Sequence, residues 1–249
     1  MHIKKGYVPT KFGQIHYRFC GNGQPIILLH PTPRSSIVFE NLIHKLSEEY
    51  AVFAPDTFGF GQSDQLPNGF DFYKLAEAFF EFVNYLSLDK VIIFGIHTGN
   101  KICAAIGYKN YRCVESLILC GMSHSLILDK KKRNSQINAI ANKDSNSDSY
   151  GNRWKKTFNL INNSWWTKKI LENKNLSSKD FKFAQNEVLD FINSRESYDL
   201  IYQENYKFDF EKAVRNITVP VLIIELISDR EKDIGPQADS YKSFGDHFY

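Results

Sequence analysis

The chain has 249 residues, enough for one α/β domain with an insertion but short for two full domains. Hydrophobic residues make up 43% and aromatic residues 14% of it, a composition that excludes an intrinsically disordered protein. The formal net charge of +3 is too small to indicate nucleic-acid binding by itself. We therefore expect a globular protein with a large apolar core and no nucleic-acid partner.

Nothing in the sequence predicts export, a membrane span or a metal centre. The first ten residues include basic residues but no apolar stretch, and no segment approaches the roughly 18 apolar residues of a membrane helix. The cysteines form no CxxC pair and no paired spacing with histidine, which argues against the common zinc patterns. We expect a cytoplasmic protein in which most cysteines are small buried hydrophobic residues.

Short apolar runs alternate with segments of helical periodicity in the first half of the chain. Runs such as Pro25–Leu29 are continuously apolar, as in parallel strands covered on both faces. Between Phe72 and Leu86 apolar residues recur at spacings of three and four, which is typical of an amphipathic helix. In chain order we expect strands at 14–20, 25–29, 50–55, 90–94 and 114–119, and helices capped by Ser35 or Ser36, at 72–86 and at 99–108. This alternation predicts an α/β fold with a doubly wound, mostly parallel sheet.

The pattern changes between residues 122 and 207, where lysine, asparagine, serine and tryptophan are frequent and no buried strand is evident. Segments around 154–166 and 181–191 favour helices, the apolar run Pro220–Ile224 is the next strand, and 236–244 favours a further helix. We therefore expect a core of residues 1–121 and 208–249 with an inserted helical lid at 122–207. Tryptophan beside lysine can also indicate nucleic acid or an anionic membrane, but we prefer lid helices with their lysines in water.

Three segments of the chain carry motifs of a known family. Residues 28–36 (LLHPTPRSS) are similar to the HGxP loop, residues 53–64 (FAPDTFGFGQSD) to the PDxxGFGxSD segment, and residues 91–99 (VIIFGIHTG) to the strand and GxSxG turn of the α/β hydrolases. Their order and spacing resemble the dehalogenase-like and epoxide-hydrolase-like branches of that family. A weaker match runs from Pro220 to Asp229. The resemblance covers roughly residues 10–121 and 215–245 and implies the α/β-hydrolase fold.

His97 stands where this family carries serine, cysteine or aspartate as its nucleophile. We expect a tight, strained turn that points the side chain into the site, with Gly95 and Gly99 giving the next helix room to pack. Free N–H groups at the start of that helix favour an oxyanion. The resemblance implies that the backbone amides of Thr32 and Thr98 form the oxyanion hole.

Three interpretations of His97 remain open. Its imidazole can act as a nucleophile or as a general base if an acid orients it. It can also be a polar residue of a noncatalytic ligand pocket, or an inert part of a turn that is kept for packing. The hydroxyl of Thr98 is a second candidate nucleophile, but the turn is expected to aim His97 into the site.

The acid and the base of the site are sought near the C-terminus. The resemblance implies Asp229 as the acid that orients a base, and Glu225 is either a second-choice acid or a feature of a strand end. The base should follow one more strand. Residues 245–249 look like the approach to that strand, so His247 is an early candidate for the base, and we expect the final strand and helix to be missing.

Other polar and aromatic residues are candidates for the pocket or for its loops. His30, His124 and Trp165 are possible pocket residues, although His124 can equally be a solvated loop residue. Arg34 and Asp64 are expected to fix loops.

The resemblance implies a hydrolase-fold enzyme that acts on a small ester-like or related substrate, with no metal and no cofactor. One alternative is a noncatalytic pseudo-enzyme that binds a small ligand in the lidded pocket. The other is a C-terminally truncated, inactive relative.

Overall fold

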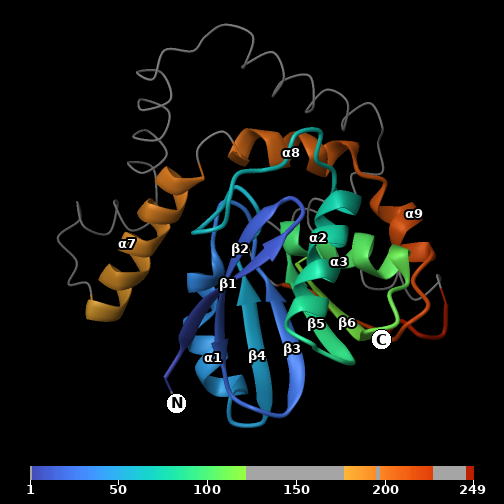
Figure 1. Ribbon diagram of the computed structural model, residues 1–249, viewed down its shortest axis with the longest axis horizontal. Coiled ribbons are helices and arrows are strands. Elements are labelled where there is room, and N and C mark those ends of the chain that lie inside the picture. The colour runs from blue at the N-terminus through green and yellow to red at the C-terminus, as the bar shows by residue number, and fades with distance from the viewer. Residues whose placement is uncertain (1, 122–176, 195–196, 227–244) are drawn as a thin grey trace, which may run out of the picture.

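Seven strands form one sheet in the computed structural model, which describes residues 2–121, 177–194, 197–226 and 245–249. Their order across the sheet is β1-β2-β4-β3-β5-β6-β7 (Figure 1). Strands β3 to β7 run parallel, and β1 and β2 are antiparallel to their neighbours. This topology confirms the predicted α/β fold with a mostly parallel sheet. The strands are β1 (Lys4–Thr10), β2 (Gly13–Cys20), β3 (Gln24–Leu29), β4 (Tyr50–Pro55), β5 (Val91–Ile96), β6 (Val114–Cys120) and β7 (Val221–Ile224).

No apolar pattern in the sequence predicts β1, the edge strand of the sheet. It pairs with β2 along its whole length, from Lys4 opposite Phe19 to Thr10 opposite Gly13. Val8 is its one buried residue. Lysines, a glycine and a proline on an exposed edge strand discourage pairing with other chains, and they also remove the alternation that would identify a strand.

Helices cover both faces of the sheet. On one face, the 3₁₀ turn η1 (Ser36–Phe39) and helix α1 (Glu40–Leu46) pack over β2 and β4. On the other face, α2 (Phe72–Tyr85), α3 (Thr98–Lys109) and α9 (Phe210–Arg215) share the larger core. Helices α7 (Ser178–Asn193) and α8 (Ser197–Lys207) lie between β6 and β7 in the chain, and α8 crosses above one end of the sheet (Figure 1).

The predicted helices of the first half agree with the structure except in the serine cap. Ser35 precedes η1, but its side chain makes no capping hydrogen bond to that turn. Its hydroxyl donates instead to Asp190, and the N–H of Ser36 donates to Asp56. Ser35 therefore stands at the predicted capping position, but carboxylates from two distant segments replace the capping hydrogen bond.

The second half agrees with the prediction in part. Helix α7 contains the predicted segment 181–191. Helix α8 was not predicted, because only Ser197 and Ile201 along it are fully buried and its sequence is mostly polar. Helix α9 has only 6 residues, too few to show a period. The helices expected at 154–166 and 236–244 lie outside the described residues.

The last residues of the chain pair with β7. The N–H of Val221 donates to the carbonyl of His247 over 2.8 Å, and the N–H of Ile223 donates to the carbonyl of Tyr249 over 2.9 Å. The N–H of Tyr249 donates back to Val221, and Phe248 forms a parallel bridge with that residue. Residues 247–249 therefore begin to extend the sheet, as expected of the approach to a further strand. Glu225 is exposed just beyond β7, which fits a strand end.

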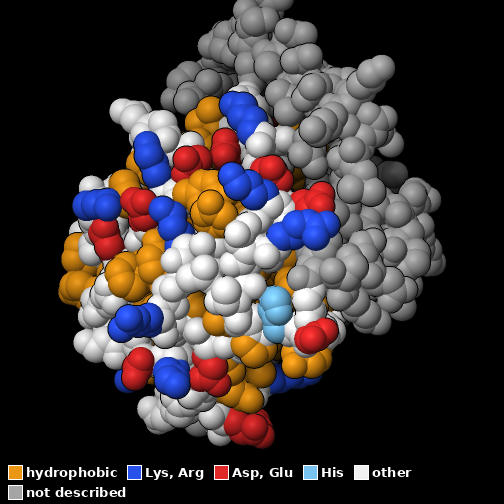
Figure 2. Space-filling view, turned by 90° about the vertical axis from the view of Figure 1, so that its right-hand side faces the viewer, with side chains coloured by type: hydrophobic (Ala, Val, Ile, Leu, Met, Phe, Trp, Pro, Cys, Tyr) orange, Lys and Arg blue, Asp and Glu red, His pale blue; other side chains and the backbone are white. Residues whose placement is uncertain are grey.

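Charged side chains of both signs are interspersed on one face of the described part of the molecule. On the face shown in Figure 2, lysine and arginine lie beside aspartate and glutamate, with apolar side chains between them. Such a distribution matches the small net charge of +3. Among the described residues, no helix is long and apolar enough to cross a membrane.

Lys101 places an ionisable amine in the apolar core. Helix α3 is buried along most of its length, and Lys101 in it is only 2% exposed. Its ammonium lies 5.9 Å from the centre of the Phe210 ring on α9. Burial lowers the pKa of this lysine to about 7, because the charged form loses its hydration.

We expect Lys101→Met to stabilise the protein. The pKa of this lysine is lower in the folded chain than in the unfolded one, so the unfolded chain binds more protons between about pH 7 and pH 10.5 and stability rises with pH over that window. Below about pH 7 the full cost of the buried charge is present, and the methionine variant should gain on the order of 2–4 kcal/mol. Urea unfolding followed by circular dichroism at about pH 6 and about pH 10 measures the gain.

The gain in stability from Lys101→Met should be smaller at about pH 10 than at about pH 6. Lys109→Met is the matched control, because Lys109 lies exposed on the same helix and forms a surface ion pair with Glu77. Its effect should stay within about 1 kcal/mol at both pH values. A stabilisation of Lys101→Met that did not depend on pH would contradict the assignment.

Candidate active site

A sharp turn joins β5 to α3, and His97 stands at its apex. The backbone of His97 has φ 51° and ψ −107°, and a positive φ is uncommon for a residue other than glycine. Its N–H donates to the carbonyl of Cys120 over 3.1 Å, and its carbonyl accepts from the N–H of Asn100 over 3.0 Å. The strained turn predicted from the sequence is therefore present at His97.

Close packing explains the two glycines that flank this turn. A Cβ atom on Gly99 would lie 2.3 Å from the carbonyl oxygen of Leu29, at the end of β3. A Cβ atom on Gly95 would lie 2.5 Å from the sulfur of Cys103 and from the carbonyl oxygen of Gly99. No other side chain fits at either position without a backbone shift, so both glycines serve the predicted packing of α3.

The ring of His97 lies beside the ends of the neighbouring strands. A Cβ atom on Gly121, directly after β6, would lie 2.9 Å from Cε1 and 3.2 Å from Nδ1 of this ring. The same point would be 2.8 Å from Leu226, just after β7. His97, Gly121 and Leu226 therefore meet at the carboxyl ends of parallel strands, where open α/β sheets bind their ligands.

Asn100 holds this edge together and was not predicted as a site residue. Its side-chain amide donates to the carbonyls of Cys120 over 2.7 Å and of Gly121 over 3.0 Å. Its Oδ1 accepts from the N–H of Cys120 over 3.0 Å. Asparagine in a buried helix needs such partners, and this requirement is the signal in the sequence that could have identified it.

Thr32 follows β3 and Thr98 follows β5, and these two strands are parallel neighbours in the sheet. Thr98 is the first residue of α3 and is buried, and its hydroxyl lies 3.5 Å from the amide nitrogen of Asn205 on α8. Thr32 lies in a turn closed by the N–H of Arg34, which donates to the carbonyl of Pro31 over 2.8 Å. Because β3 and β5 pair in parallel, this turn and the His97 turn lie side by side.

A buried carboxylate, Asp56, connects three segments of the chain: the loop after β3, the loop after β4 and strand β2. It accepts from the N–H of Ser36 over 2.6 Å, from the N–H of Gln62 over 2.9 Å, and lies 2.7 Å from Nδ1 of His16. Burial raises the pKa of Asp56, but these hydrogen bonds and the nearby His30 outweigh it and lower the pKa to about 2. The carboxylate is therefore charged and serves as a structural anchor.

His30, a predicted pocket candidate, has both ring nitrogens engaged by the backbone. Its Nε2 accepts from the N–H of Thr57 over 2.9 Å, so the proton resides on Nδ1, 3.1 Å from the carbonyl of Pro31. The side chain is only 2% exposed. Burial lowers the pKa of His30, against the opposing effect of Asp56. In this structure His30 fixes the loops after β3 and β4.

The loop-fixing roles expected for Asp64 and Arg34 agree with their contacts. The carboxylate of Asp64 accepts from the N–H of Gln14 over 2.8 Å, and Arg34 pairs with Glu187 over 3.4 Å. Asp229, His124 and Trp165 lie outside the described residues, so their predicted roles remain predictions. Among the described residues, no cluster of three histidine, cysteine, aspartate or glutamate side chains is arranged to hold a metal ion.

Comparison with known proteins shows which family the sequence matches. The sequence matches a family model described as alpha/beta hydrolase fold over residues 24–225. Over 114 residues it is 36% identical to a soluble epoxide hydrolase of Corynebacterium sp. (strain C12), covering 46% of this chain and 40% of that protein. Over 109 residues it is 34% identical to haloalkane dehalogenase 2 of Mycobacterium tuberculosis, covering 43% of this chain and 38% of that protein. The matches span about two fifths of these relatives.

Solved structures resemble the whole described architecture. An epoxide hydrolase from Vigna radiata, VrEH1, superimposes with a TM-score of 0.69 at 16% identity, covering 97% of this chain and 87% of that one. The epoxide hydrolase CorEH superimposes with a TM-score of 0.62 at 24% identity, covering 90% of this chain and 82% of that one. At these identities the likeness concerns the fold.

We expect Asp56→Asn to destabilise the protein by about 2–4 kcal/mol at neutral pH, since an amide nitrogen would face donors that now bind a carboxylate. The pKa of Asp56 is lowered to about 2 from an ordinary 3.8. Its stabilising effect is thus fully present above about pH 4 and is lost as the pH falls toward 2. Urea unfolding of the parent and of Asp56→Asn across this pH range measures the difference in their free energies of unfolding. That difference should become smaller in acid.

Asp64→Asn is the control for this experiment, because Asp64 is exposed and accepts one hydrogen bond from Gln14. Asp64→Asn should lower the free energy of unfolding by about 1 kcal/mol or less. Equal losses for the two variants would show that Asp56 is not the anchor of these loops.

Proposed function

This chain belongs to the α/β-hydrolase fold family, and from that premise we propose that it hydrolyses a small ester-like substrate at the turn that holds His97. The observation that carries the proposal is the backbone of His97, held at φ 51° between two glycines that tolerate no side chain. A strained conformation of this kind persists only where the surrounding structure enforces it, and it is common at functional sites.

In this proposal, two backbone N–H groups stabilise the oxyanion. The N–H of Thr98 belongs to the first turn of α3, whose amides carry a partial positive charge. The N–H of Thr32 comes from the turn after the neighbouring strand β3. In this proposal both amides donate to the oxygen that becomes negative during the reaction. These roles need no particular side chain, so they are compatible with histidine at the apex.

Histidine at the apex favours acyl substrates over alkyl ones. The names of two relatives refer to epoxides and haloalkanes, and attack of an imidazole on such a carbon would give an N-alkyl histidine. That product has no carbonyl for water to attack, so the enzyme could not regenerate. An acyl imidazole does have one, and water cleaves it readily. We therefore propose an ester-like substrate for this chain.

The proposed cycle balances without a cofactor. The unprotonated ring nitrogen of His97 adds to the ester carbonyl, and the oxyanion collapses with loss of the alkoxide, which takes the proton of the other ring nitrogen. Water then adds to the acyl carbonyl and the nitrogen–carbon bond breaks. The carboxylic acid leaves, and one proton of that water returns to the imidazole. Asp229 is proposed to orient a base for the water step.

Residues 122–207 are proposed to cover the site as a lid. Two observations support this placement. Helix α8 crosses above the strand ends (Figure 1), and its Asn205 approaches Thr98 at the start of α3. A lid of this kind would exclude water and select a small-molecule substrate. His124 and Trp165 belong to the same proposed segment.

We expect His97→Ala to lower kcat/KM for p-nitrophenyl acetate at least about 100-fold, because it removes the proposed nucleophile. Any exposed histidine can react slowly with such an activated ester, so His44→Ala, which removes an exposed histidine of α1, is the matched control. The control should retain the parent rate. Initial rates above the uncatalysed background measure both effects. Equal rates for the parent and His97→Ala would remove His97 from the mechanism.

We also expect esters and epoxides to give opposite outcomes. An ester should turn over, with a transient acyl group on the peptide that contains His97 after acid quenching. Styrene oxide should give a stable adduct at His97 and no sustained diol release, since the alkylated ring cannot be hydrolysed. Peptide mass spectrometry and product chromatography measure the two outcomes. Catalytic formation of a diol would contradict the preference for acyl substrates.

A further inference from the structure

Helix α7 contacts the loop after β3 through a buried carboxylate. Asp190 is only 5% exposed, and it is separated from its partner Ser35 by 155 positions in the sequence. One carboxylate oxygen accepts from the hydroxyl of Ser35 over 2.6 Å, and the other accepts from the N–H of the same residue over 3.1 Å. Asp190 therefore binds both donors of a single serine.

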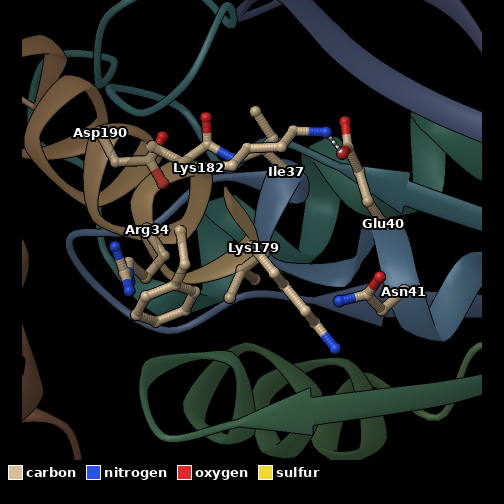
Figure 3. A pocket seen from close by; sticks show the side chains of 10 residues that line it. Arg34, Ile37, Glu40, Asn41, Lys179, Lys182 and Asp190 are labelled. Atoms are coloured by element: carbon tan, nitrogen blue, oxygen red, sulfur yellow. Dashed lines mark hydrogen bonds and ion pairs between the residues drawn. The ribbon is translucent and has the colours of Figure 1, made fainter. Parts of the chain in front are cut away.

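The same face of α7 makes a second set of contacts with this loop. Phe183, Glu187 and Asp190 recur at spacings of four and three, which places them on one side of the helix. Arg34 lies 5.0 Å from the centre of the Phe183 ring and pairs with Glu187 over 3.4 Å. Arg34 and Asp190 line a cavity of about 130 Å³ between α7 and η1–α1 (Figure 3).

Two carboxylates hold consecutive backbone amides of this loop. Asp190 on α7 accepts from the N–H of Ser35, and Asp56 at the end of β4 accepts from the N–H of Ser36. Directly before them, the N–H of Arg34 closes the turn that contains Thr32. The turn is thus fixed from one side by the core and from the other by α7.

This arrangement links α7 to a backbone group with a proposed role in the reaction. If α7 shifts, the carboxylate of Asp190 moves with it, and Ser35 loses the partner of both its donors. The turn that presents the N–H of Thr32 would then keep only its contacts with the core, through Asp56 and His30. Because hydrogen bonds to an oxyanion depend steeply on geometry, a small displacement of this turn weakens stabilisation of the transition state.

We propose that Asp190 is a positioning residue that sets the turn of Thr32 for the reaction through its two hydrogen bonds to Ser35. This inference rests on the proposed function, since it assigns the N–H of Thr32 to the oxyanion. The inference goes beyond the proposed function because it makes the position of the Thr32 N–H depend on α7, a helix remote in the sequence from the turn. Asp190 is not a catalytic residue, because it acts through Ser35.

We expect Asp190→Asn to lower kcat for p-nitrophenyl acetate roughly 10- to 100-fold while KM changes less than about threefold. Such a split indicates loss of an interaction made in the transition state rather than in substrate binding. Ser35→Ala should have a smaller effect, because the backbone N–H remains. The double variant should be no worse than Asp190→Asn, since both changes act on one contact.

Glu187→Gln is the matched control on the same face of α7. It weakens the ion pair with Arg34 but leaves the contact between Asp190 and Ser35 in place. Partly exposed pairs contribute little, so its kcat should stay within about twofold of the parent. A fall in kcat for Glu187→Gln equal to that for Asp190→Asn would show that general packing of α7, and not Asp190, matters.

Hydrogen exchange gives a readout that does not depend on activity. In Asp190→Asn the amides of residues 34–36 and of α7 should exchange at least about tenfold faster, while those of α2 stay protected. If the parent enzyme is inactive but this change is seen, the proposed function fails and the link between α7 and the turn stands. If the parent is active and Asp190→Asn retains both its kcat and its protection, the inference is overturned and the proposed function stands.

Discussion

The contact between α3 and the end of β3 is the constraint on which the candidate site depends. Gly99 presses so close to the carbonyl of Leu29 that a Cβ atom would approach it to 2.3 Å. With the helix held there, the chain has one residue in which to turn from β5 into α3, and His97 adopts φ 51° to do so. The same contact brings the start of α3 beside the loop that follows Leu29. One close approach therefore sets both the apex of the turn and the neighbourhood of the proposed oxyanion.

Buried carboxylates then fix the loops around this turn. A buried charge is costly unless it is well paired, so each such group specifies one arrangement of its partners. Asp56 has hydrogen-bonding partners in three segments, and its pKa is lowered to about 2. Asp190 has the two donors of Ser35, and there burial prevails and raises its pKa. The better-paired carboxylate anchors the loops within the core, and the other attaches α7 to them.

The turn and the backbone amides are features of the fold, whereas the reaction depends on the side chain at the apex. The family assignment rests on the match to the family model over residues 24–225, and epoxide hydrolases of low sequence identity share the fold. A fold of this kind supports many reactions. An imidazole in place of a carboxylate or hydroxyl changes which covalent intermediates water can cleave. For this reason the chemistry of His97, and not the names of the relatives, selects the proposed substrate class.

The sequence by itself determined the parallel sheet, the strained turn at His97 and the need for glycine at positions 95 and 99. These features are local: apolar runs, helical periodicity and the spacing of a motif appear within a few residues. It did not determine β1, whose exposed edge carries no apolar pattern, or α8, whose buried face is too small to show a period.

Only the tertiary structure decided which polar groups meet. The carboxylate of Asp190 binds Ser35 across 155 positions, and the amide of Asn100 holds the end of β6 across 20. It also gave the ring of His30, a predicted pocket residue, two backbone partners from separate loops. Hydrogen bonds between distant segments follow from how helices and strands pack, and that packing is not encoded in any local pattern.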